Sequence, residues 1–524
     1  MAVLTVSPRV GENWFWLPSM FVFDPSDPTI QIDATATTVT LNATSPFLAG
    51  LVTVTVTGTG FTYFDDGSGE PGRPLSGDVQ TMSLQVGGET WVTATGLTVD
   101  LIDLDHFMFG WRQNGIQRPG NGWELFSLLL AGNDSIIGSD GADELIGGRN
   151  AGNDVFHAGA GVDYIQADAG NDTIFGGADE DTYSLSDSFY DGAAYRGATV
   201  NLATGVAIDC WGGRDSLDSI ESVIGSRLAD RFVGSANDEQ FSGLRGNDTI
   251  TGGGGIDIVR YSRDLSFGGE LGVRVNLALG RATDGWGNTD TLNDIDGAVG
   301  TSMADSFVGD GADNYFVGGD GVDSYRGGAG RDMVVFDDEG ASVGAVVNLG
   351  RASAQVRNDG YGRTETLVGI EDLWGTLYGD ALTGDTQANM LFGYRGNDTL
   401  IGGAGDDTLE GGAGSDRLTG GTGADSFRFS KRFDTTDPWG DTITDFQRGT
   451  DRLSFTVADF AGMDGAQVQV GTQAGSSGQG WFIFNDAFDQ LFWDADGLGG
   501  AEAIFVATLS GVNGLSLADF DFLT

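Results

Sequence analysis

The sequence is poor in the residues on which disulfide-bonded and zinc-binding proteins depend. Its 524 residues contain one cysteine, Cys210, and two histidines, His106 and His157. A single cysteine excludes an intrachain disulfide and every cysteine-based zinc motif. Because zinc is otherwise held mainly by histidine, two separated histidines also argue against a zinc centre. Proline is scarce as well, with nine residues.

Positive charge and long apolar runs are also lacking. The chain has 26 Lys+Arg against 76 Asp+Glu, a formal net charge of −50, and Lys431 is its one lysine. Nucleic acid is therefore not an expected partner, because phosphate binding needs clusters of basic residues. No apolar run reaches the roughly 18 residues of a membrane-spanning helix. The N-terminus also lacks the basic and apolar regions of a Sec signal peptide. We expect neither a membrane span nor a Sec signal.

Glycine and aromatic residues, by contrast, are abundant. Glycine contributes 88 of 524 residues, about one in six, whereas about 7% is usual. Collagen and Pro/Gly-rich disorder are excluded, because proline is scarce and 40% of the residues are hydrophobic. The 32 Phe, 11 Trp and 11 Tyr are too many for a solvated acidic tail. This composition predicts a regular, glycine-punctuated β architecture whose negative charge is neutralised by cations.

A nine-residue repeat accounts for much of the glycine. From Ala131 onward the sequence returns to the frame G-G-x-G-x-D-x-U-x, in which U is apolar. The frame occurs in twenty copies, and an apolar or aromatic residue stands two positions after the sixth residue of every copy. The sixth positions, which are the candidate metal ligands, are Asp134, Asp143, Asp154, Asp163, Asp172, Asp181, Asp230, Glu239, Asp248, Asp257, Asp305, Asn314, Asp323, Asp332, Asp380, Asn389, Asp398, Asp407, Asp416 and Asp425.

The repeat length predicts both the local structure and the metal. Nine residues supply one short strand, which points U inward, and one tight turn, so two repeats form one coil of a parallel β-roll. Glycine permits positive φ and lets backbone carbonyl groups converge on an ion, and Asp supplies the hard oxygen that Ca²⁺ prefers. Because successive turns share ligands, we expect several Ca²⁺ ions between coils. The candidate backbone ligands are Gly132, Gly161, Gly170, Gly246, Gly396, Gly405 and Gly414.

This pattern resembles the RTX (repeats-in-toxin, hemolysin-type) calcium-binding family, whose nonapeptide signature has the same frame. The resemblance implies an all-β fold, in which calcium-binding parallel β-roll blocks with β-rich inserts follow a small N-terminal β domain. The alternative is a metal-free, glycine-rich solenoid. It would stack seventeen Asp and one Glu without a counter-ion, where like charges repel strongly. The calcium-binding roll is therefore favoured.

A longer repeat separates the nonapeptide blocks. Asp215, Asp290 and Glu365 lie 75 residues apart, with further acidic residues in the same phase. Each copy carries an alternating Val-Asn-Leu segment for which we expect a strand, at residues 200–202, 275–277 and 347–349. Each copy also has an aromatic residue on a glycine-rich turn, namely Trp211, Trp286 and Tyr361. We expect these rings to pack on the roll, with a binding surface as the alternative.

The first 121 residues have a different composition, and their apolar and polar residues alternate as in β-strands. Val52, Val54 and Val56 are separated by threonines, as in a half-buried strand, and Gly87-Gly88 divides two further predicted strands. Residues 122–130 are expected to form a short amphipathic helix over the first coil, since a terminal repeat needs a cap. The acidic loop 65–70 lacks EF-hand spacing, so we interpret it as a solvated turn.

The nonapeptide frame ends after Phe429. The following segment, DTITDFQRGTDRLSF, leads into an aromatic stretch and the finish AEAIFVATLSGVNGLSLADFDFLT. This region resembles the C-terminal part of serralysin-type RTX proteins, and the resemblance covers about residues 130–524. It implies a cap on the roll that carries an uncleaved type I secretion signal.

The expected segments follow from these boundaries. They are the N-terminal β domain (1–121), the first RTX block (122–184), an insert with the second block (185–260), an insert with the third block (261–335), an insert with the fourth block (336–429), and the capping and secretion-signal region (430–524).

No catalytic motif is recognised in the sequence. A serralysin would carry H-E-x-x-H for zinc and an RTX lipase would carry G-x-S-x-G, but neither occurs. His106 and His157 are expected to be packed or surface residues. Paired carboxylates are abundant, so residue type alone does not exclude a glycosidase. Most acidic residues, however, follow the calcium phase, and we expect a protein that is not an enzyme.

These observations predict a secreted, non-catalytic calcium-binding RTX protein, located outside the cell or at its surface. Without calcium the roll is expected to stay unfolded through self-repulsion, and extracellular Ca²⁺ would couple binding to folding after type I export. One alternative is a surface-layer, matrix or adhesin protein that assembles with calcium, and another is a hydrolase with an unrecognised N-terminal site. The expected partners are Ca²⁺ and the type I secretion apparatus. Self-association and a cell-surface polysaccharide are further candidates.

Overall fold

The computed structural model describes the backbone of the strands between Val3 and Arg118 and, in more detail, residues 133–147, 152–167, 169–186, 196–336, 340–430, 440–459, 467–471, 480–496 and 502–523. The predicted helix at 122–130, the acidic loop 65–70, His106 and Gly132 lie outside these residues. The described residues form strands and short 3₁₀ helices, with no α-helix among them, which confirms the all-β fold class. They fall into two compact units, Met1–Asp257 and Ile258–Thr524.

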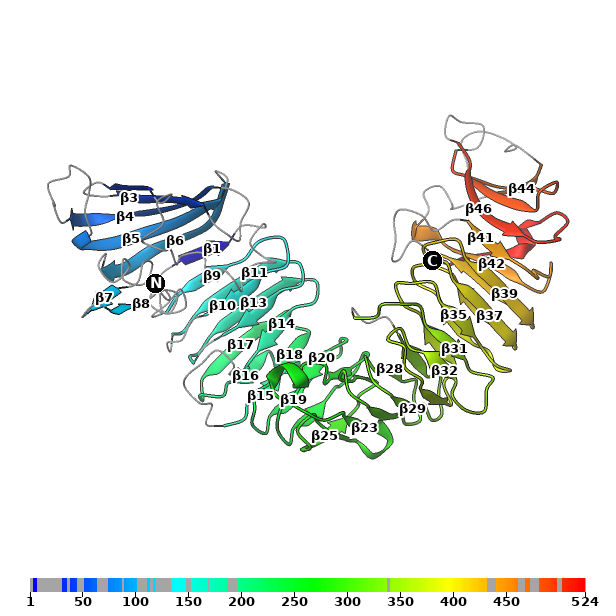
Figure 1. Ribbon diagram of the computed structural model, residues 1–524, viewed down its shortest axis with the longest axis horizontal. Helices are drawn as coiled ribbons and strands as arrows, with labels where there is room; N and C mark the ends of the chain where they lie inside the picture. The colour runs from blue at the N-terminus through cyan, green and yellow to red at the C-terminus, as the bar shows by residue number, and fades with distance from the viewer. Residues whose placement is uncertain are drawn as a thin grey trace. The chain divides into compact units, whose positions relative to one another are not determined.

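The first unit begins with an antiparallel sheet (Figure 1), in which β2, β3, β4, β5 and β6 pair in chain order and β1 pairs with β6. Its strands are β1 (Val3–Val6), β2 (Gln31–Ala34), β3 (Thr38–Thr44), β4 (Leu51–Tyr63), β5 (Pro74–Val86) and β6 (Glu89–Asp100). A separate hairpin joins β7 (Trp111–Gln113) to β8 (Ile116–Arg118). The strand predicted around Val54 is confirmed, and Val54 lies opposite Leu84. The predicted division at Gly87-Gly88 is confirmed too, because β5 ends and β6 begins on either side of it.

The first strand of the chain also borders the roll. Strand β1 pairs in parallel with β9 (Ser135–Ile137), and Leu4 lies opposite Ile136. A strand exposed at the edge of a sheet invites pairing with other chains. The edge of the first coil, for which the sequence predicted a helical cap, is thus covered by a strand in the described residues.

From residue 133 the first unit alternates between two sheets of short strands. One sheet contains β9, β11 (Val155–Ala160), β13 (Thr173–Ala178), β17 (Arg214–Asp218), β16 (Val206–Ile208), β15 (Thr199–Asn201), β19 (Arg231–Val233) and β21 (Thr249–Thr251). The other contains β10 (Glu144–Ile146), β12 (Tyr164–Gln166), β14 (Thr182–Ser184), β18 (Ser222–Ile224) and β20 (Gln240–Ser242).

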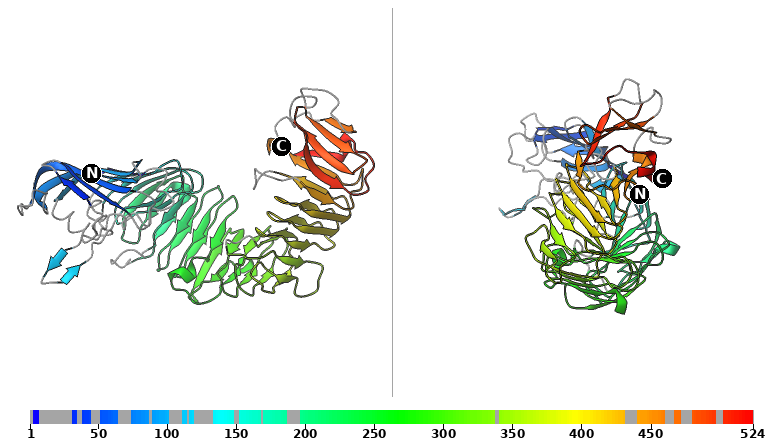
Figure 2. Two further views of the ribbon diagram at one scale, coloured as in Figure 1. Left: turned by 45° about the horizontal axis from the view of Figure 1, so that its top comes forward. Right: turned by 90° about the vertical axis from the view of Figure 1, so that its right-hand side faces the viewer.

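The register explains why a nine-residue repeat builds a roll. Two repeats advance the chain by 18 residues and bring equivalent strands side by side, so Phe156 lies opposite Ile174 and Ile165 opposite Tyr183. The apolar residues two positions after the predicted ligands all point inward and are at most 3% exposed. They form columns along the roll axis, and Figure 2 shows the short strands stacked in each unit. The predicted coil of two repeats is confirmed.

The second unit continues the same design. One sheet begins with β25 (Thr289–Asn293), β24 (Arg281–Thr283), β23 (Arg274–Asn276), β27 (Ser306–Val308), β29 (Ser324–Arg326) and β33 (Thr366–Val368). A separate ten-stranded sheet, next to which Val356 and Glu365 form an isolated bridge, contains β32 (Val356–Asn358), β31 (Val346–Asn348), β35 (Ala381–Thr383), β37 (Thr399–Ala404), β39 (Arg417–Thr422), β41 (Asp441–Ile443), β46 (Ile504–Leu509), β45 (Gln490–Asp494), β44 (Trp481–Asn485) and β43 (Gln467–Val470). The other sheet contains β22 (Ile258–Arg260), β26 (Gly297–Val299), β28 (Tyr315–Val317), β30 (Met333–Val335), β34 (Asp372–Trp374), β36 (Met390–Phe392), β38 (Thr408–Glu410), β40 (Ser426–Phe429), β42 (Arg452–Thr456) and β47 (Phe520–Leu523).

Each insert adds an antiparallel meander to one sheet. The first insert runs β15, β16, β17 along the chain, but in the sheet β13 pairs with β17, β17 with β16, β16 with β15, and β15 with β19. The opposite sheet gains the single strand β18 from the same stretch. The second insert places β25, β24 and β23 before β27, and the third places β33, β32 and β31 before β35.

The predicted Val-Asn-Leu strands are shifted by one residue. They end at Asn201, Asn276 and Asn348. In the first insert the Asn201 side chain accepts the backbone N–H of Thr204 at 2.9 Å and so starts the 3₁₀ helix η2 (Leu202–Thr204). Leucine thus belongs to a turn, because the asparagine caps it. The other 3₁₀ helices among the described residues are η3 (Asp264–Phe267), η4 (Leu277–Leu279), η5 (Val457–Asp459) and η6 (Leu517–Asp519).

The C-terminal segment extends both sheets of the second unit. Strand β46 pairs in parallel with β41, and β47 with β42, after which β45 and β44 continue antiparallel from β46. An aromatic cluster fills the space between the sheets, and the buried Phe482 ring lies 4.6 Å from the rings of Phe455 and Phe520. In the described part of the chain, no helix is long and apolar enough to span a membrane.

Candidate metal centres

All twenty predicted ligand positions occupy the same place in the roll. Each one directly precedes a strand, as Asp172 precedes β13 and Asp398 precedes β37. Each is at most 3% exposed. The frame read from the sequence therefore places these side chains in two buried rows, one before each sheet.

The two rows are linked from coil to coil by hydrogen bonds. In most of the coils, one carboxylate oxygen accepts the backbone N–H of the equivalent residue in the coil before it, whereas Asp143 and Glu239 accept from Ser139 and Ser235 of their own turns. Asp154 Oδ1 accepts from Asp134 at 2.7 Å, Asp172 Oδ1 from Asp154 at 2.7 Å, and Asp398 Oδ1 from Asp380 at 2.7 Å. In these acids, one of the two carboxylate oxygens thus fixes the spacing between coils.

The other carboxylate oxygen often has no protein partner. The buried oxygens without a hydrogen-bond donor in the described part of the chain belong to Asp154, Asp163, Asp172, Asp181, Glu239, Asp323, Asp332, Asp398, Asp407 and Asp416, among others. Buried polar atoms in native proteins are nearly always satisfied by protein, water or ions. Carboxylate oxygens repeated between coils fit calcium, which takes six to eight oxygen ligands.

Burial makes these carboxylates costly to ionise without a cation. Desolvation, with a smaller contribution from the neighbouring carboxylates of Asp215 and Asp154, raises the pKa of Asp172 to about 8. Desolvation likewise raises the pKa of Asp398 to about 9, with a contribution from Asp416. A bound Ca²⁺ supplies positive charge that reverses this effect.

The glycines in the turns let successive coils approach closely. A Cβ on Gly170 would overlap the carbonyl oxygen of Gly152 in the coil before it. Gly414 has φ +147°, and a Cβ there would overlap the carbonyl oxygen of Gly396. Gly161, Gly396 and Gly405 also have positive φ, and Gly246 packs against Asp248 and Leu228. The role of these residues as backbone ligands stays a prediction, as it does for Gly132 outside the described residues.

Three of the predicted ligands are already satisfied by protein donors. Asp230 accepts the backbone N–H of Ala198 at 2.6 Å, the N–H of Ser226 at 2.7 Å and the Ser226 hydroxyl at 2.9 Å. Asp305 and Asp380 are held in the same way, by Thr301 and Thr376. Their turns carry Ser or Thr four residues before the acid and no glycine two residues before it. This difference is visible in the sequence and marks the first coil after each insert.

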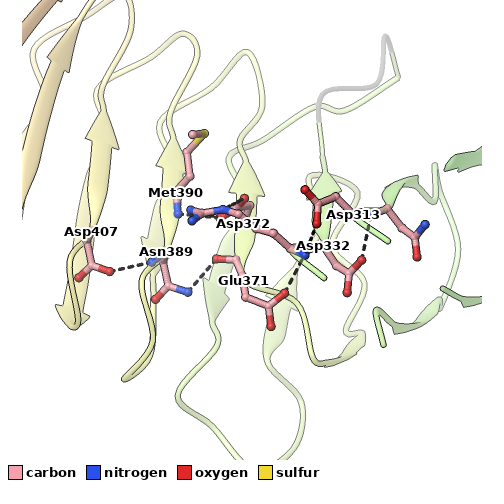
Figure 3. A network of polar contacts seen from close by, with 9 residues as sticks. Asp313, Asp332, Glu371, Asp372, Asn389, Met390 and Asp407 are labelled. Carbon is pink, nitrogen blue, oxygen red and sulfur yellow. Dashed lines mark hydrogen bonds and ion pairs between the residues drawn. The ribbon is translucent and has the colours of Figure 1, made fainter. Parts of the chain in front are cut away.

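The two asparagines are satisfied as well. Asn389 Oδ1 accepts the N–H of Asp385 at 2.8 Å, and its Nδ2 donates to the carbonyl oxygen of Glu371 at 2.7 Å. Asn314 makes the equivalent bonds to Asp310 and Asp296. Figure 3 shows the Asn389 amide between Glu371 and Asp407. An amide donor thus contacts a carbonyl group that would otherwise be open to an ion.

The rows also continue through residues outside the nonapeptide frame. The equivalent backbone N–H groups of Asp172, Asp181, Asp332, Asp416 and Asp425 donate to side chains that are not in the twenty copies. These acceptors are Asp215 (2.9 Å), Glu221 (3.0 Å), Glu371 (3.0 Å), Asp441 (3.0 Å) and Asp451 (3.2 Å). Some of them share the 75-residue phase of the sequence, but the missing glycines hid their equivalence to the repeat.

The aromatic residues of the insert turns are half-buried. The backbone N–H groups of Trp211, Trp286 and Tyr361 donate to the aspartate two residues before them, at 2.8–3.0 Å. His157 is exposed, and its ring stacks on Phe175 at 4.8 Å. It is a surface residue, as predicted.

The family model for the RTX calcium-binding nonapeptide repeat (4 copies) matches residues 130–151, 149–183, 224–261, 299–334, 374–409 and 392–427. The chain belongs to the RTX calcium-binding repeat family. Its RTX repeats bind several Ca²⁺ ions, and the buried rows of carboxylates are where the structure fits them. The three RTX inserts lie largely outside the matched residues.

Among solved structures, the chain is similar to the AlgE6R3 subunit of the mannuronan C5-epimerase of Azotobacter vinelandii. The identity is 30%, over 27% of this chain and 77% of that one, with a TM-score of 0.21. It is also similar to the extracellular lipase LipA of Serratia marcescens, at 17% identity over 56% of this chain and 39% of that one, with a TM-score of 0.17. None of the curated proteins matches.

The RTX rows hold carboxylates in pairs rather than in dense clusters. Among the described residues, no three acidic, histidine or cysteine side chains already converge as metal ligands. A site shared by the carboxylates of successive coils and by backbone carbonyl groups needs no such triplet. That the free oxygens of neighbouring coils and the carbonyl groups of the glycine turns together bind the ions stays a prediction.

Proposed function

We propose that this RTX protein is a non-catalytic, secreted calcium-binding protein that folds when it meets Ca²⁺ outside the cell. The observation that supports this most directly is the pair of buried rows, in which carboxylate oxygens lack a protein donor. Without cations these acids must be protonated or repel one another, and both oppose folding at neutral pH. Calcium that binds only the folded rows adds its binding free energy to the stability of the fold.

Export before folding is consistent with the same electrostatics. A chain with a net charge of −50 and about one glycine in six has little drive to fold where free calcium is scarce. We infer export by a type I system, directed by the C-terminal region, and a location outside the cell or at its surface. Once calcium is bound, β46 and β47 would close the end of the roll.

The non-catalytic role is argued from the distribution of the acids. The sequence has neither H-E-x-x-H nor G-x-S-x-G, and most buried carboxylates of the described residues belong to the coil-to-coil rows. We infer that the negative charge serves ion binding. The six segments expected from the sequence, with the N-terminal β domain first, stay part of this proposal.

The test is a calcium titration of the full chain, in which far-ultraviolet circular dichroism measures the β structure and light scattering coupled to size exclusion measures the mass. We expect little β signal in chelator at neutral pH and a cooperative rise with Ca²⁺, whereas Mg²⁺ at the same concentration has a much smaller effect. A fully folded chain in chelator at neutral pH would contradict the proposal. The mass in calcium tests assembly: large particles that form with calcium would favour a surface-layer or matrix role over a monomeric binder.

A further inference from the structure

The three inserts share one loop that the nonapeptide repeat does not contain. It begins at Asp209, Asp284 or Asp359, and Oδ1 of each accepts the backbone N–H groups two and four residues later, at 2.7–3.0 Å. Six residues after it stands another buried acid, Asp215, Asp290 or Glu365. The repeat match leaves all of these residues out. Each insert therefore brings two buried acids to the roll.

In the first two inserts, protein groups donate to these acids. Tyr183 donates its hydroxyl to Asp215 Oδ2 at 2.5 Å, and Tyr261 donates its hydroxyl to Asp290 Oδ2 at 3.0 Å. In the second insert Asn288 Nδ2 also donates to Asp284 Oδ2, at 2.8 Å. These donors compensate for burial of the carboxylates without a metal.

The third insert has neither a tyrosine nor an asparagine at the positions of Tyr261 and Asn288. Phe336 stands 75 residues after Tyr261 and takes the same place in the fold. Its backbone N–H donates to the carbonyl oxygen of Trp374 at 2.9 Å, as the N–H of Tyr261 donates to that of Val299 at 2.8 Å. Phenylalanine, however, has no hydroxyl to donate to an acid. Arg363 replaces Asn288, and its guanidinium pairs with Asp320 at 2.9 Å on the surface.

Three buried carboxylate oxygens are left without a donor in this insert. They are Asp359 Oδ2, Glu365 Oε2 and Asp323 Oδ2, the last from the neighbouring nonapeptide coil. The three residues are 2%, 3% and 2% exposed. The other oxygens of Asp323 and Asp359 are occupied by backbone N–H groups, of Asp305 at 2.7 Å and of Tyr361 and Arg363 at 2.9 and 2.8 Å. The free oxygens are thus the part of each group that remains for a ligand.

The three groups also act on one another. Burial raises the pKa of Glu365 well above its usual range, and the carboxylates of Asp323 and Asp359 raise it further. The side chains of Asp323 and Glu365 lie within hydrogen-bond reach of one another. Two buried carboxylates in contact are stabilised by a cation between them.

We propose that Asp323, Asp359 and Glu365 hold a Ca²⁺ ion at the third insert, with two of the three ligands from outside the nonapeptide repeats. This inference rests on the proposed calcium-loaded roll. Three hard anionic ligands on one insert loop and one neighbouring coil favour Ca²⁺. The three side chains must move toward one another to contact one ion, because no three described side chains converge as metal ligands without it. In the first two inserts, tyrosine hydroxyls donate to Asp215 and Asp290, so we assign no equivalent ion to those two acids.

The test counts calcium ions on the full chain by native mass spectrometry. Asp359→Asn and Glu365→Gln keep an acceptor oxygen for the backbone bonds and remove one charge each, so both variants are expected to carry one ion fewer than the wild type. Phe336→Tyr removes no acid but restores the hydroxyl of the second insert, and it is also expected to carry one ion fewer. The matched control is Asp209→Asn in the first insert, which should keep the full number.

The site is refuted if Asp359→Asn, Glu365→Gln and Phe336→Tyr bind as many ions as the wild type while Asp398→Asn, in a nonapeptide repeat, loses one. A wild type that binds no calcium would instead overturn the proposed function itself.

Discussion

At the scale of single residues, the sixth-position acid has two separate tasks. One oxygen fixes the spacing between coils by accepting a backbone N–H, as Asp398 does from Asp380, and the other is left for the ion. An asparagine oxygen can also accept a backbone N–H, although Asn314 and Asn389 accept it from their own turns, and it brings no negative charge for the ion. The division predicts that charge removal affects calcium affinity more than the architecture of the coil.

Asp398→Asn is therefore expected to raise the calcium concentration needed for folding by about tenfold, the scale on which removal of a metal-supporting group acts. The asparagine oxygen can still accept the Asp380 N–H. The measurement is the midpoint of the circular dichroism change in a calcium titration. Asp406→Asn is the matched control, because this exposed acid also accepts a backbone N–H, from Ala424 at 2.8 Å. Equal midpoints for the two variants would contradict the assignment of Asp398.

Close approach of the turns gives a second prediction at this scale. In Gly170→Ala the new methyl group would overlap the Gly152 carbonyl oxygen, and overpacking of this kind typically costs about 1–3 kcal/mol. We expect lower thermal stability in saturating calcium. Gly311→Ala is the control, since a Cβ there meets no atom within 4 Å. If the two variants have the same melting temperature, the coil spacing does not depend on Gly170.

The sequence was sufficient to predict the positions of the buried acids and their apolar partners, because the nine-residue period fixes both. It did not separate acids that need an ion from acids that do not. Asp230 and Asp398 have the same frame position, but Ser226 and the Ala198 N–H satisfy the first, whereas Asp398 keeps a free oxygen. The donor to the second oxygen of Asp230 is Ser226, four residues before it. This residue is visible in the sequence, but the fold was needed to show that it donates to the acid.

At the scale of elements, the inserts show that local sequence patterns predict strands but not the order in which the strands pair. The alternation and the glycine turns predicted strands in each insert, yet the reversed order β17, β16, β15 in the sheet was not predicted. Strand alternation states which residues face inward, while the choice of partner depends on contacts with β13 and β19. Across the first insert, one sheet thus gains three strands where the other gains one.

The C-terminal strands provide the prediction at this scale. Phe482 of β44 is fully buried between Phe455, Phe520 and Trp493. Phe482→Ala should destabilise the C-terminal end by about 3–5 kcal/mol, as large-to-small changes of buried aromatic residues do. Chemical denaturation in saturating calcium measures this loss. Phe488→Ala is the control, since Phe488 is 69% exposed; equal effects would show that β44 does not close the roll.

At the scale of the whole molecule, the scarcity of positive charge and the abundance of glycine are parts of one design. Glycine turns bring the coils close enough to bury the acids, and the 26 basic residues are far too few to neutralise 76 acidic ones. The −50 charge is thus a property of the calcium-free chain. We infer that ions held inside the two rows neutralise the acids, and we therefore expect folding to depend on both calcium and pH.

The pH dependence of the calcium-free chain follows from the raised carboxylate pKa values. In the calcium-free fold, burial raises the pKa of Asp154 and Asp163 to about 7, of Asp172 to about 8 and of Asp398 to about 9. In the unfolded chain these groups titrate near 4. A group whose pKa is raised by folding binds its proton more tightly in the fold. Its stabilising contribution is complete below about pH 4 and disappears as the pH rises through its folded pKa.

In chelator, the β signal should therefore be larger at pH 5 than at pH 8, while saturating calcium should give the full signal at pH 8. Calcium affinity should fall on acidification, because protons and Ca²⁺ compete for the same oxygens. Circular dichroism across this pH range, with and without calcium, measures both trends. Asp398→Asn should weaken the pH dependence in chelator, because it removes one group with a raised pKa, whereas Asp406→Asn should leave it unchanged. A calcium-free β signal that grows from pH 5 to pH 8 would show that the buried acids do not control folding.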